Sequence, residues 1–109
     1  MTTEANVVAA IDCGTNSIRL LIAARVDHRL RDIHREMRIV RLGEGVDATG
    51  RFAVEALART EAALADYAAL LREHGVRKLR MVATSATRDA ENRDEFFAMT
   101  AGVLGGVVP

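Results

Sequence analysis

The order of apolar and polar residues along the chain predicts an α/β arrangement. A continuous apolar run at 7–12 is typical of a strand buried on both faces, and a second apolar run follows at 18–26. A weakly alternating segment at 30–42 predicts a half-exposed third strand, with a turn at 27–29 before it. The chain should therefore open as a three-stranded meander.

Helical spacing replaces this pattern in the middle of the chain. Leucines that recur every seven residues predict an amphipathic helix over about 53–74. Ala53 would be its N-cap, and Gly75 would adopt the left-handed conformation common just after a helix. Residues 78–84 form a fourth strand, which should lie parallel to the first because a helical crossover joins the meander to it.

Two polar segments flank these elements, and a second helix ends the chain. Residues 43–50 contain three glycines and are expected to be a loop, as is the polar segment 84–91. Asn92 should cap a helix that runs to about residue 104, with Glu95 completing a capping box.

The predicted element order is β-β-β-α-β-α, with the sheet order 3-2-1-4, in a single partial domain over residues 1–109. The βα rhythm breaks off after the second helix, so a further strand is expected beyond Pro109. Without that strand the fourth strand is an exposed edge, which could pair with a second copy of the chain to give a homodimer.

Composition narrows the class of protein. Fifteen basic and fifteen acidic residues cancel, so neither nucleic acid nor an acidic membrane is expected as a partner. No apolar run approaches the roughly 20 residues that span a bilayer, and the polar N-terminus does not resemble a signal peptide. The single cysteine, Cys13, permits no intrachain disulfide and is expected to be a buried filler. We expect a soluble, cytoplasmic protein.

The turn after the first strand carries the most chemistry. Asp12 ends the strand and could position a hydrated Mg²⁺. Four small or polar residues follow whose amides and hydroxyls could form an anion-binding nest: Gly14, Thr15, Asn16 and Ser17. Arg19 would add positive charge. The alternative is a plain hairpin turn in which Asp12 accepts a local hydrogen bond.

Two further segments could reach the same crevice. Ser85 and Arg88 follow the fourth strand, and the carboxyl ends of neighbouring parallel strands face one side of a sheet. Arg88 can bind two phosphate oxygens at once, although a surface ion pair with an acidic neighbour is the alternative. Arg41 and the Gly43 amide follow the third strand, in what could equally be a flexible loop.

Three stretches, together with the helix from Ala53, resemble a known family in the same order. They are IDCGTNSIRL at 11–20, VRLGEGVD at 40–47 and VATSATRDAEN at 82–92. The family is that of the exopolyphosphatases and guanosine pentaphosphate phosphohydrolases (Ppx/GppA). The first stretch alone would also fit sugar and acetate kinases of the actin-like ATPase superfamily.

The resemblance implies a ribonuclease H-like, actin-like subdomain that takes part in Mg²⁺-assisted hydrolysis of terminal phosphate from polyphosphate or pppGpp, and hence in the stringent response. The expected phosphate-binding residues are Asp12, Gly14, Thr15, Asn16, Ser17, Arg19, Arg41, Gly43, Ser85 and Arg88. Asp12 is also a candidate metal contact through water. The family's catalytic base is expected beyond Pro109, so this chain alone should be inactive.

Two other interpretations stay open. The chain could be half of an actin-like sugar or acetate kinase, or a non-catalytic module that binds phosphate-containing regulators or associates with itself. Titration with polyphosphate, pppGpp and ATP would separate the phosphatase from the kinase.

Overall fold

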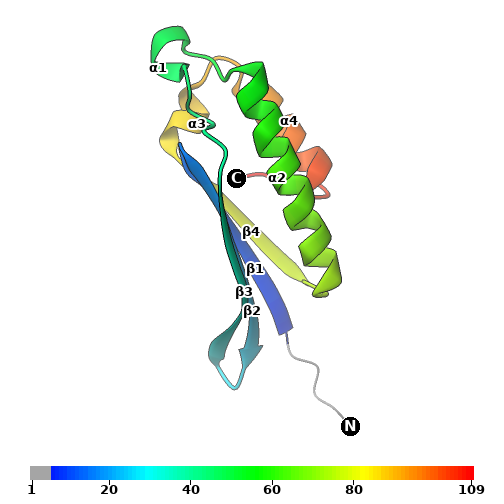
Figure 1. Ribbon diagram of the computed structural model, residues 1–109. Helices are drawn as coiled ribbons and strands as arrows, with labels where there is room; N and C mark the ends of the chain where they lie inside the picture. Colours follow the sequence, from blue (N-terminus) through cyan, green and yellow to red (C-terminus); the bar gives the residue numbers. More distant parts are fainter. Residues whose placement is uncertain (1–5) are drawn as a thin grey trace.

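The computed structural model describes residues 6–109, apart from the side chains of residues 85 and 86. One four-stranded sheet has the order β3-β2-β1-β4, as predicted. Its strands are β1 (Asn6–Cys13), β2 (Ser17–Val26), β3 (Arg29–Ile39) and β4 (Lys78–Ala83). The first three form an antiparallel meander, and β4 pairs in parallel with β1 (Figure 1). Helix α2 (Val54–Glu73) is the crossover from the meander to β4. Shortly after this helix, Gly75 adopts the predicted left-handed conformation, with φ +65°.

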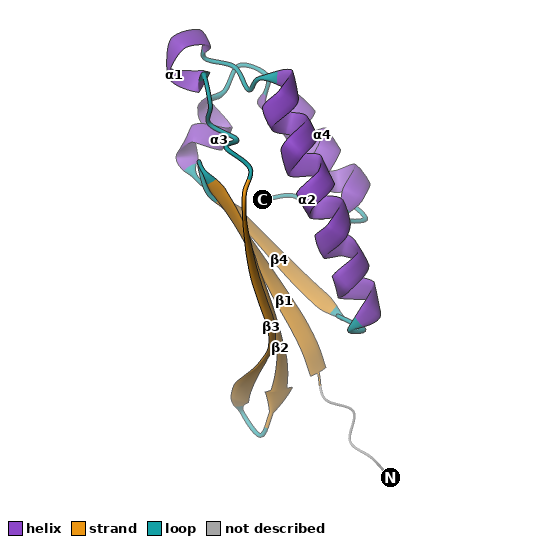
Figure 2. Ribbon diagram, in the orientation of Figure 1, coloured by secondary structure: helices purple, strands orange, loops and turns teal. Residues whose placement is uncertain are grey.

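All the long helical structure lies on one face of the sheet. Helices α2 and α4 (Arg93–Val103) run side by side there (Figure 2). The short helices α1 (Val46–Thr49) and α3 (Ser85–Asp89) lie near the end of the sheet where β1 and β4 finish. Both replace segments predicted as loops, because a single helical turn is too short to show a period in the sequence.

The core lies between the sheet and the two long helices. Ile11 and Ile18 contribute fully buried side chains from the sheet, while Tyr67 and Phe96 do so from the helices. The Tyr67 hydroxyl donates a hydrogen bond of 3.0 Å to the Ile18 carbonyl, so its polar end is satisfied within the core. Among residues 6–109, no helix has the length and apolar character needed to cross a membrane.

The second face of the sheet is uncovered within the described residues. In β1 the side chains of Ala9, Ile11 and Cys13 are buried, whereas those of Ala10 and Asp12 are exposed. The prediction that this strand is buried on both faces is therefore wrong for the described part of the chain. Its continuous apolar run supplies one face to the core and leaves the other open.

The β2–β3 hairpin extends past the rest of the sheet (Figure 1). Its turn falls at Asp27 and His28, which have φ values of +50° and +65°, as the predicted turn at 27–29 requires. Two left-handed residues give the turn a twist that matches the flanking strands. The other end of β3 is Ile39 rather than residue 42, because the next residues hydrogen-bond to the turn after β1.

Asn92 occupies the predicted N-cap position of α4, but its side chain makes no hydrogen bond that caps the helix. Its side-chain oxygen accepts a hydrogen bond from the Phe52 amide at 2.8 Å, and its side-chain nitrogen donates to the Phe52 carbonyl at 3.1 Å. The Asn92 nitrogen also lies 3.4 Å from the Glu95 carboxylate. The side chain thus joins the segment before α2 to the start of α4, and the predicted capping box is wrong.

Candidate functional site

The turn between β1 and β2 is closed by its own backbone. The Gly14 amide donates to the Ser17 carbonyl at 2.8 Å, which occupies one of the donors expected in the anion-binding nest. Within the described residues, the amides of Thr15 and Asn16 donate to no main-chain carbonyl. Both residues are exposed, which leaves these two amides as the candidate donors to an anion.

The segment 40–44 lies directly against this turn. The amides of Val40 and Arg41 both donate to the Asn16 carbonyl, at 3.0 and 2.9 Å, and the Gly43 amide donates to the Thr15 carbonyl at 2.8 Å. The Gly43 amide is thus used in holding the loops together, and not in meeting a ligand as expected from the sequence.

Gly43 lets the segment lie this close to the turn without moving the Thr15 side chain. A Cβ atom placed on Gly43 would lie closer than 3.0 Å to Cγ2 of Thr15, a separation that real Cβ atoms essentially never show. Because Gly43 has no positive φ, the requirement is one of space and not of backbone conformation. The glycine therefore lets two loops that are distant in the sequence form one surface.

Between the two loops is a hollow of about 520 Å³, which we call the loop hollow. Its lining residues are Thr15, Asn16, Ile39, Arg41, Gly43, Glu44 and Asp47. Arg41, whose backbone is left-handed at φ +51°, is the one arginine among the residues that line this hollow. The Glu44 carboxylate forms an ion pair with Arg59 at 3.0 Å, which offsets part of the negative charge beside Arg41.

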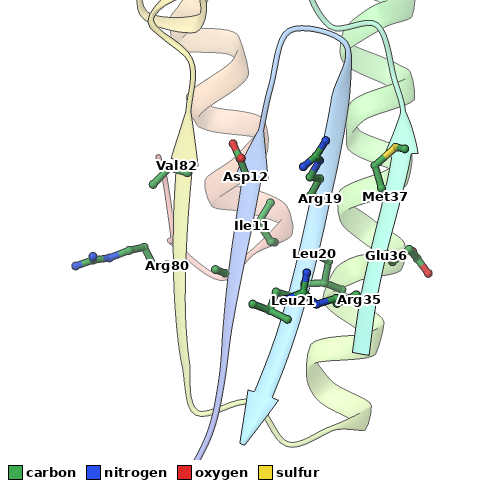
Figure 3. Close-up of a pocket in the computed structure, with 11 residues that line it drawn as sticks. Ile11, Asp12, Arg19, Leu20, Leu21, Arg35, Glu36, Met37, Arg80 and Val82 are labelled. Carbon is green, nitrogen blue, oxygen red and sulfur yellow. The ribbon is translucent and has the colours of Figure 1, made fainter. Parts of the chain in front are cut away.

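Asp12 and Arg19 belong to a different hollow, on the open face of the sheet. They are direct cross-strand partners in the β1–β2 ladder, and Figure 3 shows both near the turn that joins the two strands. With Leu21, Met37 and Val82 among other residues they line the sheet hollow, of about 550 Å³. A carboxylate beside a guanidinium suits a phosphate that brings a hydrated cation with it.

Asp12 is the candidate contact for a hydrated metal ion, and the described residues offer no protein cage for one. Within residues 6–109, no three His, Cys, Asp or Glu side chains are grouped so that they could hold a metal ion. Asp12 offers a single exposed carboxylate. Magnesium commonly takes one or two carboxylates and completes its shell with water and substrate phosphate oxygens, so Asp12 fits such a contact.

Arg88 reaches the same end of the sheet but a third hollow. The Thr84 amide donates to the Cys13 carbonyl at 3.2 Å, so the segment after β4 does meet the end of β1. Arg88, on α3, lines a hollow of about 200 Å³ with Val82, Phe97 and other residues. The Ser85 side chain lies outside what the structure describes. The three candidate arginines thus gather at one end of the sheet without sharing a hollow.

Cys13 is no nucleophile in this fold. Its side chain is fully buried, and burial, with a smaller effect from the charge of Asp12, raises its pKa to about 12. The thiolate that would attack a substrate is therefore absent near neutral pH. The prediction of a buried filler is confirmed.

One residue beside the loop hollow went unnoticed in the sequence. Arg59 is on α2, and the hydrophobic pattern of that helix does not single it out. In the structure its Nε donates to the Val40 carbonyl at 2.8 Å, in addition to its ion pair with Glu44. Its place early in the helix, just after the loop, is the only signal that could have pointed to this contact.

Comparison with known proteins agrees with this architecture. Residues 21–109 match the model of the Ppx/GppA phosphatase family. Exopolyphosphatase 2 of Mycobacterium tuberculosis is 67% identical over 106 residues, which are 94% of this chain and 33% of that protein. The guanosine-5'-triphosphate,3'-diphosphate pyrophosphatase of Pseudoalteromonas translucida is 37% identical over 102 residues, 94% of this chain and 20% of that protein.

A solved structure confirms the predicted ribonuclease H-like, actin-like fold. The crystal structure of the Aquifex aeolicus Ppx/GppA family member superposes with a TM-score of 0.91 at 37% identity, covering 96% of this chain and 34% of that one. The chain spans at most about a third of the length of these relatives. Because the family model matches residues 21–109 and the structure agrees along almost the whole chain, the protein belongs to the Ppx/GppA phosphatase family.

Proposed function

We propose that this chain supplies phosphate-binding loops to an enzyme that removes terminal phosphate from polyphosphate or pppGpp by attack of water. The observation that carries the proposal is the loop hollow, where the turn after β1 and the segment 40–44 are held together by three backbone hydrogen bonds. Relatives named as an exopolyphosphatase and as a guanosine pentaphosphate-type pyrophosphatase support a substrate with a chain of phosphates.

Arg41 and two backbone amides of the hollow suit a phosphate, and of the two carboxylates that also line it, Glu44 is paired with Arg59 while Asp47 is exposed. Phosphoryl transfer depends mostly on positioning the phosphate and stabilising its charge, with little covalent work for the protein. The Arg41 guanidinium would bind two oxygens of a phosphate, while the Thr15 and Asn16 amides would hold a third. Asp12 and Arg19 would meet the phosphate chain where the open face of the sheet begins.

Bound magnesium would offset the charge of the phosphate oxygens. Asp12 would hold such an ion through water, as its single carboxylate allows. We place the base that activates the attacking water in the remaining two thirds of the relatives' length, so the 109-residue chain should bind phosphate chains without hydrolysing them.

Calorimetric titration of the 109-residue chain with polyphosphate, pppGpp and ATP tests the proposal. Arg41→Gln should weaken polyphosphate binding about tenfold, the loss of one charge-assisted pair of hydrogen bonds. Arg72→Gln is the matched control, because Arg72 is exposed on α2 and its side chain makes no hydrogen bond or ion pair within the described residues.

Three results would count against the proposal. A preference for ATP would favour the kinase interpretation, and an equal loss in both variants would indicate unspecific attraction of a polyanion. Strong magnesium-dependent phosphate release by the 109-residue chain would show that the base is already present.

A further inference from the structure

The segment 40–44 has an unusual backbone conformation at Arg41, the residue that we propose binds phosphate. Arg41 has φ +51°, a left-handed conformation that long side chains seldom adopt. Its neighbours Val40 and Gly43 are fixed on one side by hydrogen bonds to the turn after β1. A residue in such a conformation persists only where its surroundings hold it, so the other side of the segment needs support as well.

Arg59 provides that support from the opposite side. Its Nε donates to the Val40 carbonyl at 2.8 Å, and one of its terminal nitrogens lies 3.4 Å from the Arg41 carbonyl. The same terminal nitrogen pairs with the Glu44 carboxylate at 3.0 Å. A single planar guanidinium thus reaches the residue before Arg41, Arg41 itself and the residue that ends the segment.

We propose that Arg59, together with Glu44, is a positioning pair that holds Arg41 in place for the phosphate. The inference rests on the proposed function and adds a residue that would itself touch no substrate. The donors of Arg59 are directed at two carbonyls and a carboxylate, and its charge is offset by Glu44, so it is poorly suited to bind phosphate directly.

An arginine suits this role better than a lysine. The guanidinium has five donors in a rigid plane and can serve separate acceptors at once, whereas an ammonium group is a compact charge on a flexible stem. Arg59→Lys should therefore recover only part of the function that Arg59→Gln loses. The Arg59 side chain is 41% exposed, so either replacement leaves the core intact.

The test measures tripolyphosphate affinity of the 109-residue chain by calorimetry in a double-mutant cycle. Arg59→Gln should weaken binding about fivefold in the parent chain and less than about twofold when Arg41→Gln is already present, as expected for coupled neighbours. Arg72→Gln removes the same charge from the same helix and should change the affinity less than about twofold. Equal losses for Arg59→Gln in both backgrounds, or an equal loss for Arg72→Gln, would overturn the inference.

Hydrogen exchange gives a readout that does not depend on any ligand. The Gly43 amide, bonded to the Thr15 carbonyl, should exchange about tenfold faster in Arg59→Gln, while the amides of β1 and β2 in the core keep their rates. Failure of the parent chain to bind tripolyphosphate would refute the proposed function and not this inference. Unchanged exchange at Gly43 in Arg59→Gln would refute the inference itself.

Discussion

Replacing Gly43 by alanine tests the contact between the two loops that form the candidate site. The added methyl group would lie closer than 3.0 Å to Cγ2 of Thr15, inside the roughly 3.5–4.0 Å at which carbon atoms attract one another. Since the backbone of Gly43 is not left-handed, alanine would meet no other obstacle than this side chain. We predict that Gly43→Ala destabilises the fold and that Thr15→Ser relieves the effect.

Two contributions of opposite sign set the size of the change. Alanine restricts the unfolded chain and by itself would stabilise the fold by about 0.4–1 kcal/mol. Overpacking costs about 1–3 kcal/mol in a well-packed core; because Thr15 is exposed and its methyl group can turn aside, the lower end applies here and leaves a net loss of about 0.5 kcal/mol. Thr15→Ser removes the methyl group and keeps the hydroxyl, so in that background Gly43→Ala should stabilise by about 0.5 kcal/mol.

The coupling between residues 15 and 43 is measured by urea denaturation, followed by circular dichroism. The four chains compared are the parent, the two single variants and the double variant. With a slope of about 1.3 kcal/mol per M, a coupling of about 1 kcal/mol corresponds to a difference of roughly 0.8 M between the two midpoint shifts. Effects that add to within about 0.3–0.5 kcal/mol would show that the two residues are independent and would refute the packing argument.

Three other substitutions test two buried hydrogen-bonded side chains and the buried thiol. Asn92→Ala should cost about 2–4 kcal/mol of unfolding free energy in a urea titration, because it leaves the amide and carbonyl of buried Phe52 unpaired; a loss below about 0.5 kcal/mol would contradict this. Tyr67→Phe should cost about 1 kcal/mol by thermal unfolding, through the lost bond to the Ile18 carbonyl, and an unchanged melting temperature would contradict it. The buried thiol of Cys13 has its pKa raised from 9.0 to about 12, so its contribution to stability is complete below pH 9 and is lost as the pH rises towards 12. Cys13→Ala should therefore flatten the fall of stability above pH 9, and parallel pH curves for the two chains would contradict the assignment.

The order of the sheet could be predicted because its determinants are patterns along the chain. Apolar runs locate the strands, the long helix dictates a crossover, and a crossover in one sheet makes β4 parallel to β1. Burial of the first strand could not be predicted in the same way. A run of apolar residues shows that a strand can be buried on both faces, but not whether anything within residues 6–109 covers them.

The candidate residues could be proposed one by one from the sequence, whereas their grouping in space could not. Small and polar residues in sequence indicate the turn after β1, and the glycines that follow Arg41 indicate the second loop. That Arg19, Arg41 and Arg88 line separate hollows depends on side-chain directions at three different strand ends. The role of Asn92 was hidden because its partner Phe52 is far away in the sequence, whereas a helix cap is a local interaction.

The residues of the loop hollow all come from the segment 15–47, and this affects the order in which the chain can fold. The entropic cost of closing a loop rises with the length of the loop, by about 0.6 kcal/mol of free energy for each doubling. Pairing of β1 with β4 joins residues as distant as Val8 and Lys78, so it must wait until α2 has been synthesised. As the chain leaves the ribosome, the two loops of the hollow can meet first, Arg59 can reach them next, and the parallel strand arrives last.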